Sequence, residues 1–134
     1  MSASLEIRHP DATDLPAIAA LLIAEGLGDK ALQRLSTIYA DIRGFSLVAT
    51  SNRQVQGVML ASFNGWHVFV SHLVVAPSAR SQGIGRLLIE RLASDAARMG
   101  AKAIIVDARL SVVGFFHKLQ FRTPAAVFLI RDLP

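Results

Sequence analysis

The sequence contains no cysteine, which excludes disulfide bonds, thiol catalysis and cysteine metal sites. It also lacks a long apolar run, because the stretch Ala17–Ala24 is far too short to span a bilayer and the N-terminus has no apolar segment typical of a secretory signal. Lysine and arginine are scattered along the chain instead of forming a basic run. Together these absences predict a cytoplasmic protein with neither nucleic acid nor membrane as a partner.

The composition is that of a folded, rather apolar chain. Hydrophobic residues make up 52% and charged residues 18% of the 134 residues. This composition predicts one domain over residues 1–134, with a core that is stable without covalent cross-links. The formal net charge is +4, and arginine supplies most of the cations. A solvated basic surface and a site for an anionic ligand both remain open, since the arginine side chain suits phosphate.

Hydrophobic patterning and turn residues divide the chain into alternating elements. Helices are expected from a start within Asp11–Pro16 to Gly26 or Gly28, at Lys30–Asp41, at Gly83–Met99 and at Val112–Leu119. Strands are expected at Leu5–Arg8, Phe45–Thr50, Val55–Phe63, Trp66–Val75 and Ala103–Ala108, with one or two final strands in Phe121–Ile130.

The middle strands are expected to form an antiparallel meander. Asn64-Gly65 predicts a two-residue hairpin turn in which both residues have positive φ, and Trp66 is expected to pack in the core or the hairpin. The near-continuous apolar run Ala103–Ala108 predicts a buried parallel strand. Strand, helix and strand then form a right-handed crossover within an α/β protein of the α+β type.

The stretch Val70–Ile89 contains the most informative motif. A β-branched strand is followed by Pro77, and then Gly83 and Gly85 open a helix. The N–H groups of a first helical turn have no intrahelical partners, so with arginines nearby they suit a phosphate or diphosphate. A dinucleotide-binding fingerprint would need a third glycine where Leu88 stands, and the Gly-Lys-Ser/Thr of a Walker A loop is absent.

Arg80-Ser-Gln-Gly-Ile-Gly85 resembles the R-x-x-G-x-G pattern of the GNAT superfamily of N-acetyltransferases. Gly114–Phe121 likewise resembles the family's F-Y-x-K-x-G-F segment. The resemblance implies a mixed sheet with about four helices, and acetyl-coenzyme A as co-substrate without a metal. It also implies a coenzyme A site in which the diphosphate lies on the turn and the pantetheine arm lies along a bulged fourth strand. The implied coenzyme contacts are Leu73, Val74, Val75, Arg80, Ser81, Gln82, Gly83, Ile84, Gly85, Arg86, Arg109 and Phe116.

The chemistry implied by the resemblance departs from the family at several positions. His72 stands where relatives often have a glutamate that acts as a general base, and it is either a base or a structural histidine. Phe116 replaces the family's tyrosine acid, and Arg109 and Gln120 replace an asparagine and a glycine. Asp107 can orient the substrate amine or Arg109.

The leading interpretation is an N-acetyltransferase that moves an acetyl group from acetyl-CoA to a primary amine of a small molecule or a peptide. The alternative, suggested by Phe116 and Arg109, is a catalytically weak or inactive acyl-CoA-binding domain. A basic nucleic-acid module ranks last. Many relatives form homodimers, and no residue here determines an oligomeric state.

Overall fold

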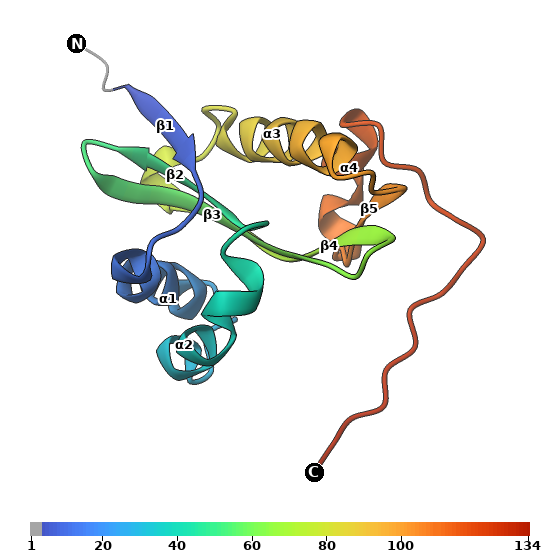
Figure 1. Ribbon diagram of the computed structural model, residues 1–134, viewed down its shortest axis with the longest axis horizontal. Helices are drawn as coiled ribbons and strands as arrows, with labels where there is room; N and C mark the ends of the chain where they lie inside the picture. Colours follow the sequence, from blue (N-terminus) through green and yellow to red (C-terminus); the bar gives the residue numbers. More distant parts are fainter. Residues whose placement is uncertain (1–3) are drawn as a thin grey trace.

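A computed structural model describes residues 4–134 and places a five-stranded sheet at the centre of the molecule (Figure 1). Strand order is β1-β2-β3-β4-β5; neighbouring strands run antiparallel except for the parallel pair β4 and β5. The strands are β1 (Leu5–Arg8), β2 (Leu47–Ser51), β3 (Gln54–Phe63), β4 (His67–Val75) and β5 (Ala103–Val106). The helices are α1 (Leu15–Ala24), α2 (Ala31–Ile42), α3 (Ile84–Arg98) and α4 (Val113–Lys118). The predicted fold class and the parallel crossover are confirmed.

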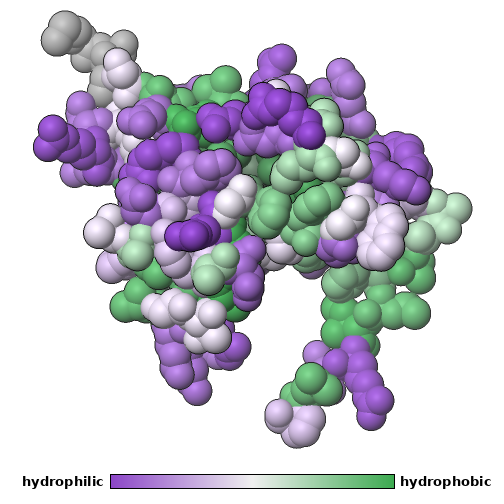
Figure 2. All heavy atoms as spheres, in the orientation of Figure 1, coloured by the Kyte–Doolittle hydropathy of each residue, from purple (hydrophilic) through white to green (hydrophobic). Residues whose placement is uncertain are grey.

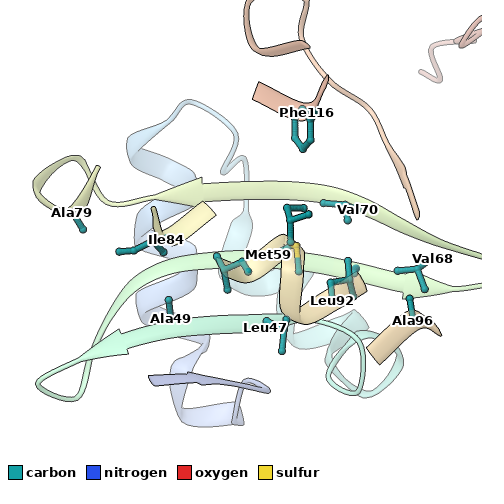
Figure 3. Packing of buried hydrophobic residues seen from close by; sticks show 13 residues of the cluster. Leu47, Ala49, Met59, Val68, Val70, Ala79, Ile84, Leu92, Ala96 and Phe116 are labelled. Atoms are coloured by element: carbon teal, nitrogen blue, oxygen red, sulfur yellow. The ribbon is translucent and has the colours of Figure 1, made fainter. Parts of the chain in front are cut away.

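Two hydrophobic clusters lie on opposite faces of the sheet. Helices α1 and α2 cover one face and α3 and α4 the other (Figure 1). Leu47 and Met59, from neighbouring strands, pack with Leu92 of α3 in the first cluster (Figure 3). Ile18 of α1 and Val58 of β3 belong to the second. Because both faces are covered, the middle strands are apolar on both sides, as their sequences predict.

The side chains of β4 alternate between the two faces of the sheet, and one extra residue shifts this alternation. Leu60 lies opposite His72 and Ala61 opposite Val70, so Ser71 has no residue opposite it on β3. Such a bulge inverts the side-chain alternation of the strand. Val70, before the bulge, belongs to the cluster under α3, whereas the even-numbered Val74 belongs to the cluster under α1 and α2.

The turn chemistry differs from the prediction at Asn64-Gly65. Only Gly65 has a positive φ, of 96°, and the Asn64 side chain accepts hydrogen bonds from the N–H groups of Trp66 at 2.9 Å and His67 at 2.8 Å. These bonds extend the loop, so β4 begins at His67, and Trp66 is 62% exposed instead of packed. The turn with two positive φ values is Asn52–Arg53, at 52° and 62°.

The prediction of one or two strands in Phe121–Ile130 is wrong. The structure has no strand within residues 107–134, and the chain leaves α4 and runs away from the body (Figure 1). β5 also ends at Val106 instead of Ala108, and Ile105 is 46% exposed. β5 ends where its pairing with β4 ends, at Val106 opposite Val70, and with no strand in Phe121–Ile130 the second edge of β5 has no neighbour. Within residues 4–134, none of the helices is both long and apolar enough to traverse a bilayer.

Candidate functional site

Strands β4 and β5 separate beyond their first four paired residues. The parallel pairing runs from His67 opposite Ala103 to Val70 opposite Val106, and Ser71–Val75 continue without a neighbour on that side. A cleft of about 650 Å³ lies there, walled by both strands and by the segment that follows α1. An open strand edge inside a cleft offers backbone N–H and C=O groups to an extended ligand.

His72 occupies the wall of this cleft, immediately after the bulge. Its Nδ1 lies 2.9 Å from the Ser71 Oγ, and the Ser71 hydroxyl in turn donates to the Leu60 carbonyl at 3.4 Å. Because the one proton of the Ser71 hydroxyl is directed at Leu60, the hydroxyl oxygen accepts a hydrogen bond from Nδ1–H, and Nε2 carries the free lone pair of the neutral ring. Partial burial lowers the pKa of His72 below its ordinary value of 6.5, which favours that neutral form.

The turn after β4 forms a cradle of unpaired backbone N–H groups. Ser81 and Gly83 both have positive φ, of 66° and 77°. Within residues 4–134, the N–H groups of residues 81–86 donate to no other group, and the first bond at this end of α3 runs from the Leu87 N–H to the Gly83 carbonyl at 3.0 Å. Successive unpaired N–H groups at a helix start make an anion site, which the helix dipole reinforces.

The two arginines beside the cradle lie in different settings. Arg80 is tied to the cleft wall, since its guanidinium pairs with Glu25 and its Nε donates to the Val75 carbonyl at 3.2 Å. Arg86 is exposed and makes no ion pair within residues 4–134. Arg86 is therefore free to meet a phosphate, whereas Arg80 must exchange one anionic partner for another.

The predicted site residues divide among three neighbouring places. The cleft is lined by His72, Leu73, Val74, Val75, Arg80, Arg109 and Phe116. Gln82 and Ile84 line a separate cavity of about 320 Å³. Ser81, Gly83, Gly85 and Arg86 line neither cavity and lie in the turn and the first helical turn.

The two glycines of the motif have different surroundings. A Cβ on Gly83 would have no atom within 4 Å, whereas a Cβ on Gly85 would lie 3.2 Å from Cζ of Phe115. A Cβ on Gly83 would therefore lie in open space, whereas the absence of one on Gly85 allows Phe115 of α4 to approach α3. A side chain added at Gly85 would therefore meet Phe115 first.

Phe116 is buried and packs edge-on against Phe115 and Phe121, with ring centroids 5.1 and 5.4 Å apart. It has no hydroxyl to donate. Asp107 and Arg109 both line the cleft, and no ion pair joins them in the part of the chain described. The sequence analysis gave no site role to five residues that also line the cleft, namely Glu25, Leu27, Phe69, Ser71 and Phe128.

Comparison with known proteins identifies the family. The model of the acetyltransferase (GNAT) family matches residues 15–121, so the chain belongs to the GNAT acetyltransferase family. No protein of curated function matches the sequence significantly.

Solved structures of similar fold cover nearly the whole chain. An acetyltransferase from Trypanosoma brucei is 23% identical with a TM-score of 0.77, and the match covers 97% of this chain and 100% of that one. An aminoglycoside N-acetyltransferase in complex with CoA is 21% identical with a TM-score of 0.78, covering 98% and 97%. Glucosamine-6-phosphate N-acetyltransferase from Arabidopsis thaliana is 14% identical with a TM-score of 0.82, covering 98% and 99%. These similarities confirm the GNAT fold.

Proposed function

We propose that this protein transfers an acetyl group from acetyl-CoA to a primary amine of a small molecule or a peptide. The observation that carries the proposal is that two unpaired backbone surfaces follow each other closely along the chain. The open edge of β4 ends at Val75, and the cradle of residues 81–86 begins six residues later. A ligand with a diphosphate and a long amide-bearing arm suits such a pair of surfaces.

The chain's own groups fit coenzyme A in three respects. The cradle N–H groups bind the diphosphate, and Gly83 leaves the space over them free of side-chain atoms. Leu73, Val74 and Val75 offer backbone groups to the pantetheine arm, as an added strand would use them. A free N–H near Leu73 would face the thioester carbonyl, where it polarises the oxygen.

His72 would serve as the general base for the acceptor. Nε2 takes one proton from the ammonium group, and the neutral nitrogen then attacks the thioester carbon while the C–S bond breaks. The nitrogen gives up its second proton to solvent, so the products are an N-substituted acetamide and the coenzyme A thiolate. The lowered pKa of His72 keeps the ring in its neutral form at physiological pH. Because Phe116 cannot donate a proton, solvent in the open cleft protonates the thiolate.

The acceptor class follows from the cleft walls and the relatives. Asp107, in the wall of the cleft, provides negative charge that attracts an ammonium group. Two relatives are named for acetylating an aminoglycoside and glucosamine-6-phosphate, both amino sugars. An amine-bearing sugar and a peptide with a free N-terminus are therefore the first acceptors to test.

The test is thiol release from acetyl-CoA in the presence of amines, read with a thiol-reactive dye. Since the chain has no cysteine, all of the colour comes from coenzyme A. We expect thiol release that depends on the amine. We also expect a product about 42 Da heavier than the amine, because an acetyl group replaces one hydrogen. Absence of coenzyme A binding by calorimetry would disprove the site itself.

Phe116 favours one second candidate, a non-catalytic acyl-CoA-binding domain. Its buried ring occupies the place from which the family's tyrosine donates a proton, and no tyrosine or cysteine lines the cleft. Heat of binding with acetyl-CoA, without thiol release for any amine in the panel, would favour this candidate.

A further inference from the structure

Two large apolar side chains of β4 and β5 belong to neither hydrophobic cluster. Phe69 and Ile105 are absent from both, whereas every other valine, isoleucine and leucine of these two strands packs in one of them. The two residues lie opposite each other in the parallel pairing, so their side chains point to the same face of the sheet. Ile105 is 46% exposed. We call the surface formed by Phe69 and Ile105 the apolar floor.

The apolar floor lies on the face that α1 and α2 cover, beyond the point where their cover ends. Val70 and Ile104, next to the floor residues along each strand, pack in the cluster under α3, so the floor points the other way. On β3, Leu60 is buried in the cluster under α1 and α2. Ser62, the next residue of β3 on that face, lies opposite Phe69 and is exposed.

The apolar floor adjoins the groups that the proposed reaction uses. Because Ser71 is the extra residue of the bulge, Phe69 and His72 are consecutive side chains on one face of β4, and such neighbours lie about 7 Å apart. Phe69 lines the cleft together with His72, and so does Asp107, two residues after Ile105. Figure 2 shows hydrophobic surface between the centre of the body and the C-terminal segment, in the region that β4 occupies in Figure 1.

The charge and polarity of these groups define the molecule that fits them. Asp107 makes no ion pair within residues 4–134, so its carboxylate is available to an ammonium group. Leu27, which is 41% exposed, adds a further apolar side chain to the cleft wall. A sugar placed over Phe69 would lose water from hydroxyl groups that find no partner there. An aromatic or branched aliphatic group would instead remove apolar surface from water.

We propose that the preferred acceptor is a primary amine with an aromatic or branched aliphatic group about two carbons from its nitrogen. The ammonium group lies between His72 and Asp107, and the apolar group packs on Phe69 and Ile105. This inference rests on the proposed function, and among its acceptors it favours apolar amines over amino sugars. A free arylalkylamine and a peptide that begins with phenylalanine share the required chemistry.

The first experiment compares matched amines by kcat/KM, read as thiol release at saturating acetyl-CoA. The pairs are 2-phenylethylamine with 2-aminoethanol, and the peptide Phe-Ala-Ala with Ser-Ala-Ala. We expect the apolar member of at least one pair to exceed its polar partner by roughly 10- to 100-fold, and that pair identifies a free amine or a peptide as the source. Thiol release without such a preference in either pair, or a higher value for glucosamine, would overturn the inference and leave the proposed function standing.

Substitutions in the apolar floor should remove the preference selectively. Phe69→Ser and Ile105→Ser should each reduce the ratio within the preferred pair by about tenfold, with kcat/KM for the polar partner and the affinity for coenzyme A unchanged. Phe69→Leu, which keeps apolar surface, should retain most of the preference. The matched control is Leu32→Ser, at a residue of α2 that is 47% exposed. A preference that persists in both serine variants would contradict the inference.

The second experiment measures acceptor binding and does not depend on turnover. The protein is saturated with coenzyme A and titrated in a calorimeter with 2-phenylethylamine and with Phe-Ala-Ala. We expect the wild type and Leu32→Ser to bind at least one of them, and Phe69→Ser to bind it about tenfold more weakly. Binding of this kind without thiol release for any amine would disprove the transferase and leave the apolar floor as the amine site. No binding of either compound, or equal affinity in Phe69→Ser, would overturn the inference.

Discussion

A glycine with positive φ stands at each end of α3, but the two ends differ in whether their backbone groups have hydrogen-bond partners. Gly83 and Gly100 have φ values of 77° and 79°, and a Cβ on either would meet no atom within 4 Å. At the C-terminal end, the N–H groups of Gly100 and Ala101 bond to the carbonyls of Ala97 and Ala96 at 3.1 and 3.0 Å. At the N-terminal end, the N–H groups of residues 81–86 have no partner within residues 4–134. One end is therefore closed by the chain, and the other is open to a ligand.

The largest effect is expected when the same substitution is made at both ends. Gly83→Val and Gly100→Val each force a side chain into the left-handed region, at a cost of about 1–2 kcal/mol or more. Only Gly83→Val places a side chain within the cradle, which comprises residues 81–86. We expect it to weaken coenzyme A binding by roughly 10²–10⁴-fold, since two hydrogen bonds to a charged phosphate contribute about 1.5–3 kcal/mol each. Isothermal titration calorimetry measures this.

Thermal melting of both glycine variants provides the control for that comparison. Similar losses of stability with loss of affinity only in Gly83→Val would sharpen the distinction between the ends. Equal coenzyme A affinities in the two variants would mean that the cradle is not part of the coenzyme A site.

Turnover, unlike coenzyme A binding, depends in our proposal on His72 in the cleft wall. His72→Gln should lower the rate by about 100-fold or more while leaving coenzyme A affinity unchanged. Since burial lowers the pKa of His72 below 6.5, the wild-type rate should fall only at pH values below that ordinary value, and the variant should lack this acidic limb. His67→Gln, on the same strand but outside the cleft lining, is the matched control. An acidic limb that persists in His72→Gln would exclude the role.

Where the protein's own groups already pair with one another, a substitution should change the free energy of unfolding and leave the affinity for coenzyme A unchanged. Asp14 is 8% exposed and accepts two hydrogen bonds from Arg8, at 2.7 and 2.9 Å. Asp14→Asn should reduce the free energy of unfolding by about 2–3 kcal/mol. Asp29→Asn, which removes an exposed partner of Arg34, should cost no more than about 1 kcal/mol. Urea titrations measure both values, and a weakened coenzyme A affinity in Asp14→Asn would contradict the separation of the two regions.

The Asp14 pair also predicts a dependence of stability on pH. Its hydrogen bonds with Arg8 lower the pKa of Asp14 below the ordinary value of 3.8. The pair's contribution is therefore complete above pH 3.8 and is lost as the pH falls through the lower pKa of the folded state. The wild type should lose stability over that range more steeply than Asp14→Asn.

The smallest effect is expected at the hydroxyl that orients His72. Ser71→Ala removes the acceptor of the Nδ1 hydrogen bond, which is worth about 1 kcal/mol, or roughly fivefold in rate. The acidic limb of the rate curve should shift while the affinity for coenzyme A stays constant. Ser62→Ala, at an exposed serine of β3, should change neither. An unshifted limb in Ser71→Ala would mean that the hydroxyl does not set the protonation of the ring.

The sequence predicts the order of elements well because apolar periodicity and glycine positions are local properties. The crossover from β4 through α3 to β5 and the turn at Gly83 are of this kind. The positive-φ hairpin turn was placed at Asn64-Gly65 and lies at Asn52–Arg53, since the Asn64 side chain stabilises a longer loop instead. The cleft contacts of Glu25 and Phe128 depend on tertiary approach, which no local pattern contains.

The bulge at Ser71 and the residues after α4 show two different limits of sequence reasoning. The bulge was expected only from the family resemblance, and the adjacent polar residues Ser71 and His72 are the local signal that could have located it. The apolar run Ala125–Ile130 predicted strand structure that is not present. A strand needs a neighbouring strand to pair with, and that is not a local property of the sequence.

The unmatched Ser71 has a consequence for the orientation of every residue after it in β4. Removing that one position would leave the same strands and the same apolar content, but it would turn His72 toward the hydrophobic cluster beneath α3. There the imidazole would be sealed from any acceptor, and Val74 would be left facing the wrong side. A single inserted residue thus determines whether His72 lies in the wall of the cleft or in the core beneath α3.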